Sequence, residues 1–133
     1  MRVFLDTNVL VSSFTTRGIC ADVVTVVVAE HQLVLGETVL AELTRVLDEK
    51  MKVPPPTIKE AESFLRQEAA VVSHGSEPDV DLRDPDDLPV LAEALEGLAE
   101  VLVTGDRDLL ELAHDLPIHI LSPRGFWERL QER

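Results

Sequence analysis

The sequence predicts an α/β fold in which a five-stranded parallel sheet is covered by helices on both faces. Short runs of strand-forming residues alternate along the chain with longer segments whose apolar residues recur at helical spacing. Acidic residues follow the first and the fourth of these runs, and ligands bind at that edge of parallel α/β sheets. A chain of 133 residues is long enough for one core of this kind and too short for two. We therefore expect a single domain over residues 1–133.

The first strand is expected over residues 2–5 and to end at Asp6, where polar residues interrupt the apolar run. A short helix should follow over residues 9–18. Residues 19–32 are rich in valine, which is typical of strands. Their length of about fourteen residues, their polar ends and the short apolar run 33–35 that follows favour a helix and then a strand.

The clearest helix is predicted over residues 38–51, because its apolar residues form one stripe. The members of the stripe are Val39, Leu40, Leu43, Val46, Leu47 and Met51. Glu42 falls just outside the edge of the stripe, so it can reach a site without being buried. The alternative role for Glu42 is a surface ion pair with Arg45 or Lys50.

Three prolines, Pro54 to Pro56, should stop this helix, and Thr57 should cap the next one, which runs to Ala69. A strand is expected over residues 70–72, followed by an exposed polar loop over residues 73–84.

Pro89 determines where the next helix begins, because proline lacks an N–H and is tolerated only in the first turn. Its N-cap should therefore be Asp86, Asp87 or Leu88. The side chains expected to face the core from this helix are Leu91, Ala94, Leu95 and Leu98.

The remainder of the chain predicts two more strands and two more helices. The fourth strand is expected over residues 101–103 and leaves the sheet through a tight turn at 104–106. A short helix over 109–113 and a last strand over 118–121 should follow. The terminal helix should begin at Ser122 or Pro123 and extend through Leu130.

The charge balance limits the kinds of partner. Twelve Lys and Arg against 25 Asp and Glu give a net charge of −13, which argues against broad, non-specific binding to nucleic acid. A local site remains compatible with this charge if divalent cations mediate the contact with phosphates. The basic residues able to flank such a site are Arg17, Arg45, Lys50, Lys52, Arg107 and Arg124.

The sequence also predicts a cytoplasmic protein without a membrane span. No apolar run reaches the ~18 residues that a span needs, and Asp6 interrupts the first apolar run too early for a signal peptide. The single cysteine, Cys20, cannot close a disulfide within the chain.

Four acidic segments occur along the chain in a recognisable order. They are Asp6-Thr7-Asn8, Glu37 to Leu43 with Glu42, Asp84 to Leu88 with Asp87, and Thr104-Gly105-Asp106. With these segments the chain resembles the PIN domain family of metal-dependent ribonucleases, which includes VapC-type toxins. The resemblance extends from the first residues to about Leu121 and implies a single PIN-like domain.

The resemblance implies roles for nine residues. Asp6, Glu42, Asp87 and Asp106 match the catalytic acids that bind the metal. The supporting positions match Asn8, Thr38, Thr104 and Asp108, and Asp84 is the second candidate for the third acid. Without the resemblance, Asp6 or Asn8 has a simpler explanation as the cap of the first helix.

The residue types fit a hard metal ion. Four carboxylates from separate elements can converge only at the carboxyl edge of the sheet, and a cation is needed to neutralise their repulsion. No His or Cys occurs beside them, which favours Mg²⁺ or Mn²⁺ over Zn²⁺. His31, His74, His114 and His119 share no ligand spacing.

The function expected from these observations is a Mg²⁺- or Mn²⁺-dependent endoribonuclease, the toxin of a toxin-antitoxin pair. Its expected partners are RNA, a small antitoxin protein and, as a homodimer, a second copy of the chain. One alternative is a PIN-like domain that binds proteins without catalysis. Another is a receiver or phosphoryl-transfer domain. Receivers have adjacent acids after the first strand and a lysine after the last, whereas this chain has Asp6-Thr7-Asn8 and no lysine beyond Lys59.

Overall fold

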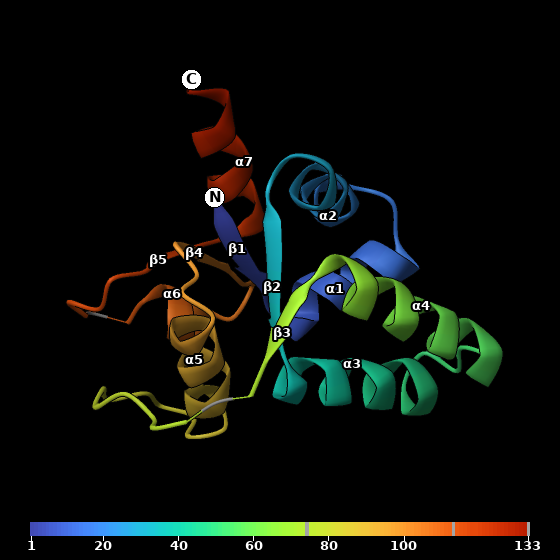
Figure 1. The fold of residues 1–133 in the computed structure, drawn as a ribbon, viewed down its shortest axis with the longest axis horizontal. Helices are drawn as coiled ribbons and strands as arrows, with labels where there is room; N and C mark the ends of the chain where they lie inside the picture. The colour runs from blue at the N-terminus through green and yellow to red at the C-terminus, as the bar shows by residue number, and fades with distance from the viewer. Residues whose placement is uncertain (74, 113, 133) are drawn as a thin grey trace.

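A computed structural model describes residues 1–73, 75–112 and 114–132 of the protein. Its centre is a sheet of five parallel strands in the order β3-β2-β1-β4-β5 (Figure 1). The strands are β1 (Arg2–Leu5), β2 (Gln32–Gly36), β3 (Ala70–Val72), β4 (Val101–Val103) and β5 (His119–Leu121). The α/β class and all five predicted strands are thereby confirmed.

The first strand of the chain occupies the middle of the sheet. β1 pairs with β2 on one side and with β4 on the other, so that Phe4 lies opposite both Val34 and Leu102. All three side chains are fully buried. Burial on both faces explains why these strands consist of continuous apolar residues rather than an alternating pattern.

Helices cover both faces of the sheet, as predicted. They are α1 (Thr7–Thr15), α2 (Ile19–Glu30), α3 (Glu37–Glu49), α4 (Pro55–Glu68), α5 (Asp87–Glu96), α6 (Arg107–Leu110) and α7 (Pro123–Gln131). α2 and α5 both contact β2 and lie on opposite sides of the sheet (Figure 1). α3 contacts α1, α4 and α5. The valine-rich segment forms α2 despite its composition, because Val23 and Val27 bury one helical face.

Helices α1, α3, α4 and α6 begin earlier than predicted. α4 begins at Pro55 with Pro54 as its N-cap, so Thr57 lies inside the helix and does not cap it. Proline fits there because the first N–H groups of a helix have no partner within the helix. α1 begins at Thr7, capped by Asp6, rather than at Val9.

Three helix ends also differ from the prediction. α3 stops at Glu49, and the side chain of Met51 is 43% exposed. α5 stops at Glu96, and Leu98, predicted to face the core, is 74% exposed. The short helix expected over 109–113 is formed by Arg107–Leu110, and Ala113 lies outside the described residues, as does His74.

The end of α5 is shaped by a close approach to the sheet. A Cβ at Gly97 would overlap the side chain of Val34 on β2, so only glycine fits there. The turn that reverses the chain falls one residue later, and Leu98 takes the left-handed conformation with φ of 55°. Gly97 is therefore required for close packing against β2, whereas the exposed Leu98 adopts the strained left-handed φ.

Across the described ranges, no single helix is long and apolar enough to span a membrane. α1 and α2 meet the length and composition criteria only together, and they are bent by 106° at their junction.

Candidate functional site

Asp6 stands where β1 leaves the sheet and passes into α1. Its backbone N–H donates to the carbonyl oxygen of Val103 on β4 at 3.0 Å. Its Oδ1 accepts from the N–H of Thr7 at 2.7 Å, and its Oδ2 accepts from the Thr104 hydroxyl at 2.8 Å. The side chain is 6% exposed. Asp6 therefore caps α1 and also presents a buried carboxylate at the edge of the sheet.

Asn8 and Thr104 tie the ends of β1 and β4 together. The Asn8 amide donates to Asp6 Oδ2 at 3.3 Å, and its Oδ1 accepts from the N–H of Gly105 at 2.8 Å. The Thr104 hydroxyl, which is fully buried, accepts from the N–H of Asp106 at 3.0 Å. Asn8 therefore hydrogen-bonds to Asp6, and Thr104 hydrogen-bonds to both Asp6 and Asp106.

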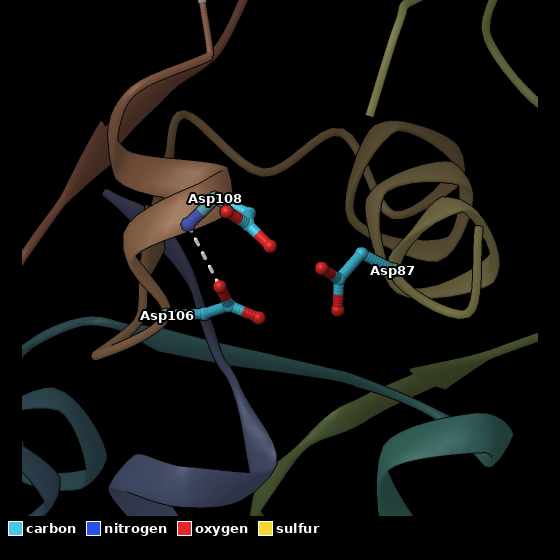
Figure 2. A group of neighbouring side chains, drawn as sticks. All are labelled: Asp87, Asp106 and Asp108. Carbon is cyan, nitrogen blue, oxygen red and sulfur yellow. Dashed lines mark hydrogen bonds between the residues drawn. The ribbon is translucent and has the colours of Figure 1, made fainter. Parts of the chain in front are cut away.

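Three aspartates converge beside this network. Asp87 is the first residue of α5, Asp106 is the N-cap of α6, and Asp108 lies in the first turn of α6. One carboxylate oxygen of each lies within 4.8 Å of the others, and Figure 2 shows the three groups directed into one shared space. Asp106 Oδ1 accepts from the N–H of Asp108 at 2.9 Å, which fixes its orientation (Figure 2).

The three acids near position 84 have different environments. Asp84 Oδ1 accepts from the N–H of Asp86 at 2.9 Å and so stabilises the turn before α5. Asp87 is the member of this group that joins Asp106 and Asp108. Asp108 also lies 3.7 Å from the guanidinium Nε of the exposed Arg83.

The electrostatics of the cluster favour a bound cation. Burial, followed by the negative charge of Asp106, raises the pKa of Asp87 to about 7. Burial also raises the pKa of Asp6, against the effect of its hydrogen bonds from Thr104 and Thr7. Asp87 Oδ2 is buried and has no hydrogen-bond partner among the described residues. A buried oxygen without a partner, among acids with raised pKa values, is a group that a cation can bind and neutralise.

A cavity of about 800 Å³ opens beside Asp87 and Asp106, whereas Asp108 lines a neighbouring pocket with Arg83. The acids and amide predicted as site residues that line it are Asp6, Asn8, Glu42, Asp84, Asp87 and Asp106. Thr38 and Arg45 of α3 also line it. The exposed Glu42 and the buried Asp6 thus share the cavity with Asp87 and Asp106 but stand outside the group of three aspartates. Arg45 pairs with Glu49 at 3.3 Å along its own helix.

The donors around the cavity suit a hard ion. Its lining in the described part of the chain offers carboxylate, amide and hydroxyl oxygens but neither histidine nor cysteine. Oxygen ligands alone are typical of Mg²⁺ and Mn²⁺ sites. The residues present therefore fit the metal that the sequence predicted.

Sequence reasoning missed one residue that contacts the site. Glu93 of α5 is 1% exposed, and its carboxylate accepts hydrogen bonds from the N–H and the hydroxyl of Thr38. One sequence signal could have identified Glu93: it is a charged residue between Val90 and Ala94, on the apolar face of a predicted helix.

Comparison with known proteins gives a family and a fold. The model of the family described as PIN domain matches residues 2–108. A structure titled VapBC2 from Rickettsia felis bound to a DNA fragment from their promoter is similar, with a TM-score of 0.69 and 12% identity; the match covers 92% of this chain and 98% of that chain. A structure of VapBC-1 from nontypeable Haemophilus influenzae has a TM-score of 0.62 and 18% identity; the match covers 93% of this chain and 99% of that chain.

None of the curated proteins compared with the chain matches it. At identities this low, the two solved structures establish the shared fold and nothing finer. The family match says more than the two structural matches, because it covers the four acidic segments and the strands that precede Asp6 and Asp106. The chain therefore belongs to the PIN domain family.

Proposed function

We propose that the protein is a Mg²⁺- or Mn²⁺-dependent endoribonuclease that works as one domain. The observation that carries the proposal is the convergence of Asp87, Asp106 and Asp108, together with a buried Asp87 Oδ2 that has no hydrogen-bond partner among the described residues. This group lies at the carboxyl edge of a parallel sheet, where α/β folds bind ligands. PIN domain proteins are nucleases, which sets the reaction class.

The site residues divide into ligands and supports. Asp6, Glu42, Asp87 and Asp106 are proposed to hold the metal. The hydrogen bonds of Asn8 and Thr104 keep Asp6 and Asp106 oriented toward it. The proposed neighbours of the ligands are Thr38, Asp84 and Asp108. When bound, the ion supplies an activated water and stabilises negative charge on the phosphate.

Arg45 gives the cavity a basic side chain in a strongly acidic protein. It lies one turn from Glu42 on the wall formed by α3, and among the described residues it forms an ion pair with the exposed Glu49. A surface pair of this kind contributes little stability, so Arg45 can exchange Glu49 for an RNA phosphate at low cost.

The geometry weakens the two alternative functions. A receiver domain has the strand order 2-1-3-4-5, whereas this sheet has the order β3-β2-β1-β4-β5. A domain kept only for protein binding has no need to hold three carboxylates in one small space, which costs stability.

Metal-dependent RNA cleavage tests the proposal. End-labelled RNA is incubated with the protein in Mn²⁺, in Mg²⁺ and in excess EDTA, and Asp6→Asn is purified in parallel to control for contaminating nucleases. We expect cleavage only with metal and only by the wild type, with 5′-phosphate ends because water attacks. Cleavage that persists in EDTA, or products with 2′,3′-cyclic phosphate, would contradict this mechanism.

We further propose an antitoxin partner and a homodimer. Both similar structures carry the name VapBC, and a net charge of −13 suits a small basic protein. Co-expression with the product of a neighbouring reading frame should give a stable complex without RNase activity.

Light scattering of the protein alone should give the mass of a dimer, and a monomer at high concentration would contradict the proposed homodimer.

A further inference from the structure

A buried carboxylate from one helix ends at the beginning of another. Both carboxylate oxygens of Glu93 on α5 lie 3.2 Å from the backbone nitrogen of Thr38, at the start of α3. The Thr38 hydroxyl donates to Glu93 Oε2 at 3.1 Å. Glu93 therefore accepts from two donors of one residue that lies 55 positions away in the sequence.

Gly36 leaves the space in which this contact forms. It is the N-cap of α3, and no side chain of its own supplies the usual capping bond. A Cβ at position 36 would overlap the carboxyl group of Glu93. The local cap is therefore replaced by a carboxylate from α5, and a negative charge at that helix end is electrostatically favourable.

The contact joins the two helices that face each other across the cavity. α5 carries Asp87 at its first position, and α3 carries Glu42 one turn after Thr38. Residues of both helices line the cavity. The contact between Glu93 and Thr38 therefore links the helix that carries Glu42 to the helix that carries Asp87.

We propose that Glu93 is a positioning residue, which caps α3 from α5 and thereby fixes the separation of Glu42 and Asp87. Glu93 does not touch the reacting atoms in this proposal. The reaction it serves rests on the proposed ribonuclease function, whereas the capping contact does not.

The variant Glu93→Ala, measured by hydrogen–deuterium exchange in EDTA and without RNA, tests the contact itself. We expect amides of residues 37–42 to exchange faster, on the order of fivefold, as for the loss of an N-cap. Val27→Ala, which truncates a buried side chain on α2, is the control. It should leave the amide exchange rates of residues 37–42 as they are in the wild type. If Glu93→Ala also leaves residues 37–42 unchanged, the cap is disproved. Should Glu93→Ala fail to fold, Glu93→Gln keeps the size and one acceptor, and it should show a smaller change in the same segment.

A second variant separates capping from positioning. Gly36→Ser combined with Glu93→Gly supplies a local N-cap, because Gly36 already has the extended backbone that a capping serine adopts. Glycine is needed at position 93, since a Cβ at position 36 would lie 2.7 Å from the Cβ of residue 93, and Glu93→Gly alone is the single-site control. The double variant should restore slow exchange in residues 37–42 but not the link to α5. We expect kcat for RNA cleavage to fall about tenfold or more in both variants, with KM within threefold, and binding of Mn²⁺ to weaken in both.

Recovery of kcat together with exchange protection in the double variant would show that Glu93 is only a cap and would overturn the positioning role. Wild-type activity in Glu93→Ala would overturn it as well. If the wild type itself does not cleave RNA, the proposed function fails, and Mn²⁺ binding and exchange still decide the role of Glu93.

Discussion

Asp87 and Asp106 bring carboxylate oxygens within 4.8 Å of each other from the starts of two different helices. Burial, and after it the negative charge of Asp106, raises the pKa of Asp87. The metal-free protein should therefore be sensitive to pH, to metal and to the loss of either charge.

The stability of the metal-free protein should fall as pH rises from about 4 to about 7. The folded state raises the pKa of Asp87 from 3.8 to about 7, so within this window the folded protein keeps a proton that the unfolded chain releases. Urea unfolding in EDTA at pH 5 and pH 8 measures the change. Asp87→Asn should flatten this dependence and exceed the wild type at pH 8 by on the order of 1 kcal/mol, a value discounted for the solvent around the site. An unchanged slope in Asp87→Asn would refute the assignment.

Adding Mn²⁺ should reverse the order of stability between the wild type and a ligand variant. A ligand that binds only the folded state at a hundred times its Kd stabilises it by about 2.7 kcal/mol. Thermal melts at pH 7.5 should show this gain for the wild type and little of it for Asp106→Asn. Ser13→Ala on α1, whose hydroxyl donates to the backbone carbonyl of Leu10, is a control that should keep the gain. Equal gains in Asp106→Asn would remove that residue from the metal site.

Replacing Thr104 by valine should cost stability and activity together. Its buried hydroxyl donates to Asp6 and accepts from the N–H of Asp106, so valine leaves the buried carboxylate of Asp6 and the half-buried N–H of Asp106 without that partner. We expect a loss of about 1–3 kcal/mol in unfolding free energy. Thr104→Ser keeps the hydroxyl and should retain most of the RNA cleavage, whereas Thr104→Val should lose it. Equal activity of the two variants would mean that the bond does not orient Asp6.

Arg45→Ala should weaken RNA binding without affecting stability. The salt bridge to Glu49 is exposed, so its loss should change the unfolding free energy by less than about 0.5 kcal/mol. Removing one phosphate contact should reduce the slope of log affinity against log salt by about 0.7 for single-stranded RNA. Fluorescence anisotropy with a short RNA and the cleavage-deficient Asp6→Asn background measures this. The same slope for Arg45→Ala as for the parent would exclude the contact.

Arg129→Ala is the charge-matched control for Arg45→Ala. Arg129 lines a separate pocket with Met1 and His119, where strands β1 and β5 begin, at the opposite edge of the sheet from the acids. It should leave the salt slope unchanged, which separates a specific contact from a change in net charge.

Leu98→Gly should stabilise the protein, because Leu98 holds a left-handed φ of 55° and is 74% exposed. Glycine adopts that conformation without strain, and little apolar burial is lost with the leucine. We expect a gain of about 1 kcal/mol in chemical denaturation. Gly97→Ala, one residue earlier, should destabilise instead, since its Cβ would overlap Val34.

The sequence was sufficient to predict the order of the elements and a helix start that depends on a single proline. Pro89 limited the N-cap of α5 to three candidates, and the structure has Asp86, one of them. The runs at residues 70–72 and 101–103 were predicted at their observed bounds. The apolar periodicity predicted helices that end later than the observed ones, as Leu98 and Met51 show. The reason is that the pattern carries no information about the turn that stops a helix.

The contacts between distant elements were not predictable from local patterns. Asp87 lies close to Asp106 and Asp108, and this proximity depends on how α5 and α6 are placed relative to each other. The role of Glu93 depends on how α5 lies against α3, and spacing within α5 carries no information about that. The sequence signal was only that an acid stood where an apolar residue was expected.

The position of β1 in the sheet has a consequence for the order of events during protein synthesis. Asp6 is made among the first residues, yet the hydroxyl that orients it belongs to Thr104, 98 positions later, and Gly105 completes the bond to Asn8. A nascent chain that has reached β3 already contains Asp6 and Glu42 but lacks β4, against which β1 must pair. Long-range pairing of this kind forms slowly and only when both strands are present. We therefore expect the ribosome-bound chain to be inert toward RNA until residues 101–108 have left the exit tunnel, so that the RNA being translated is not exposed to an assembled site on the growing chain.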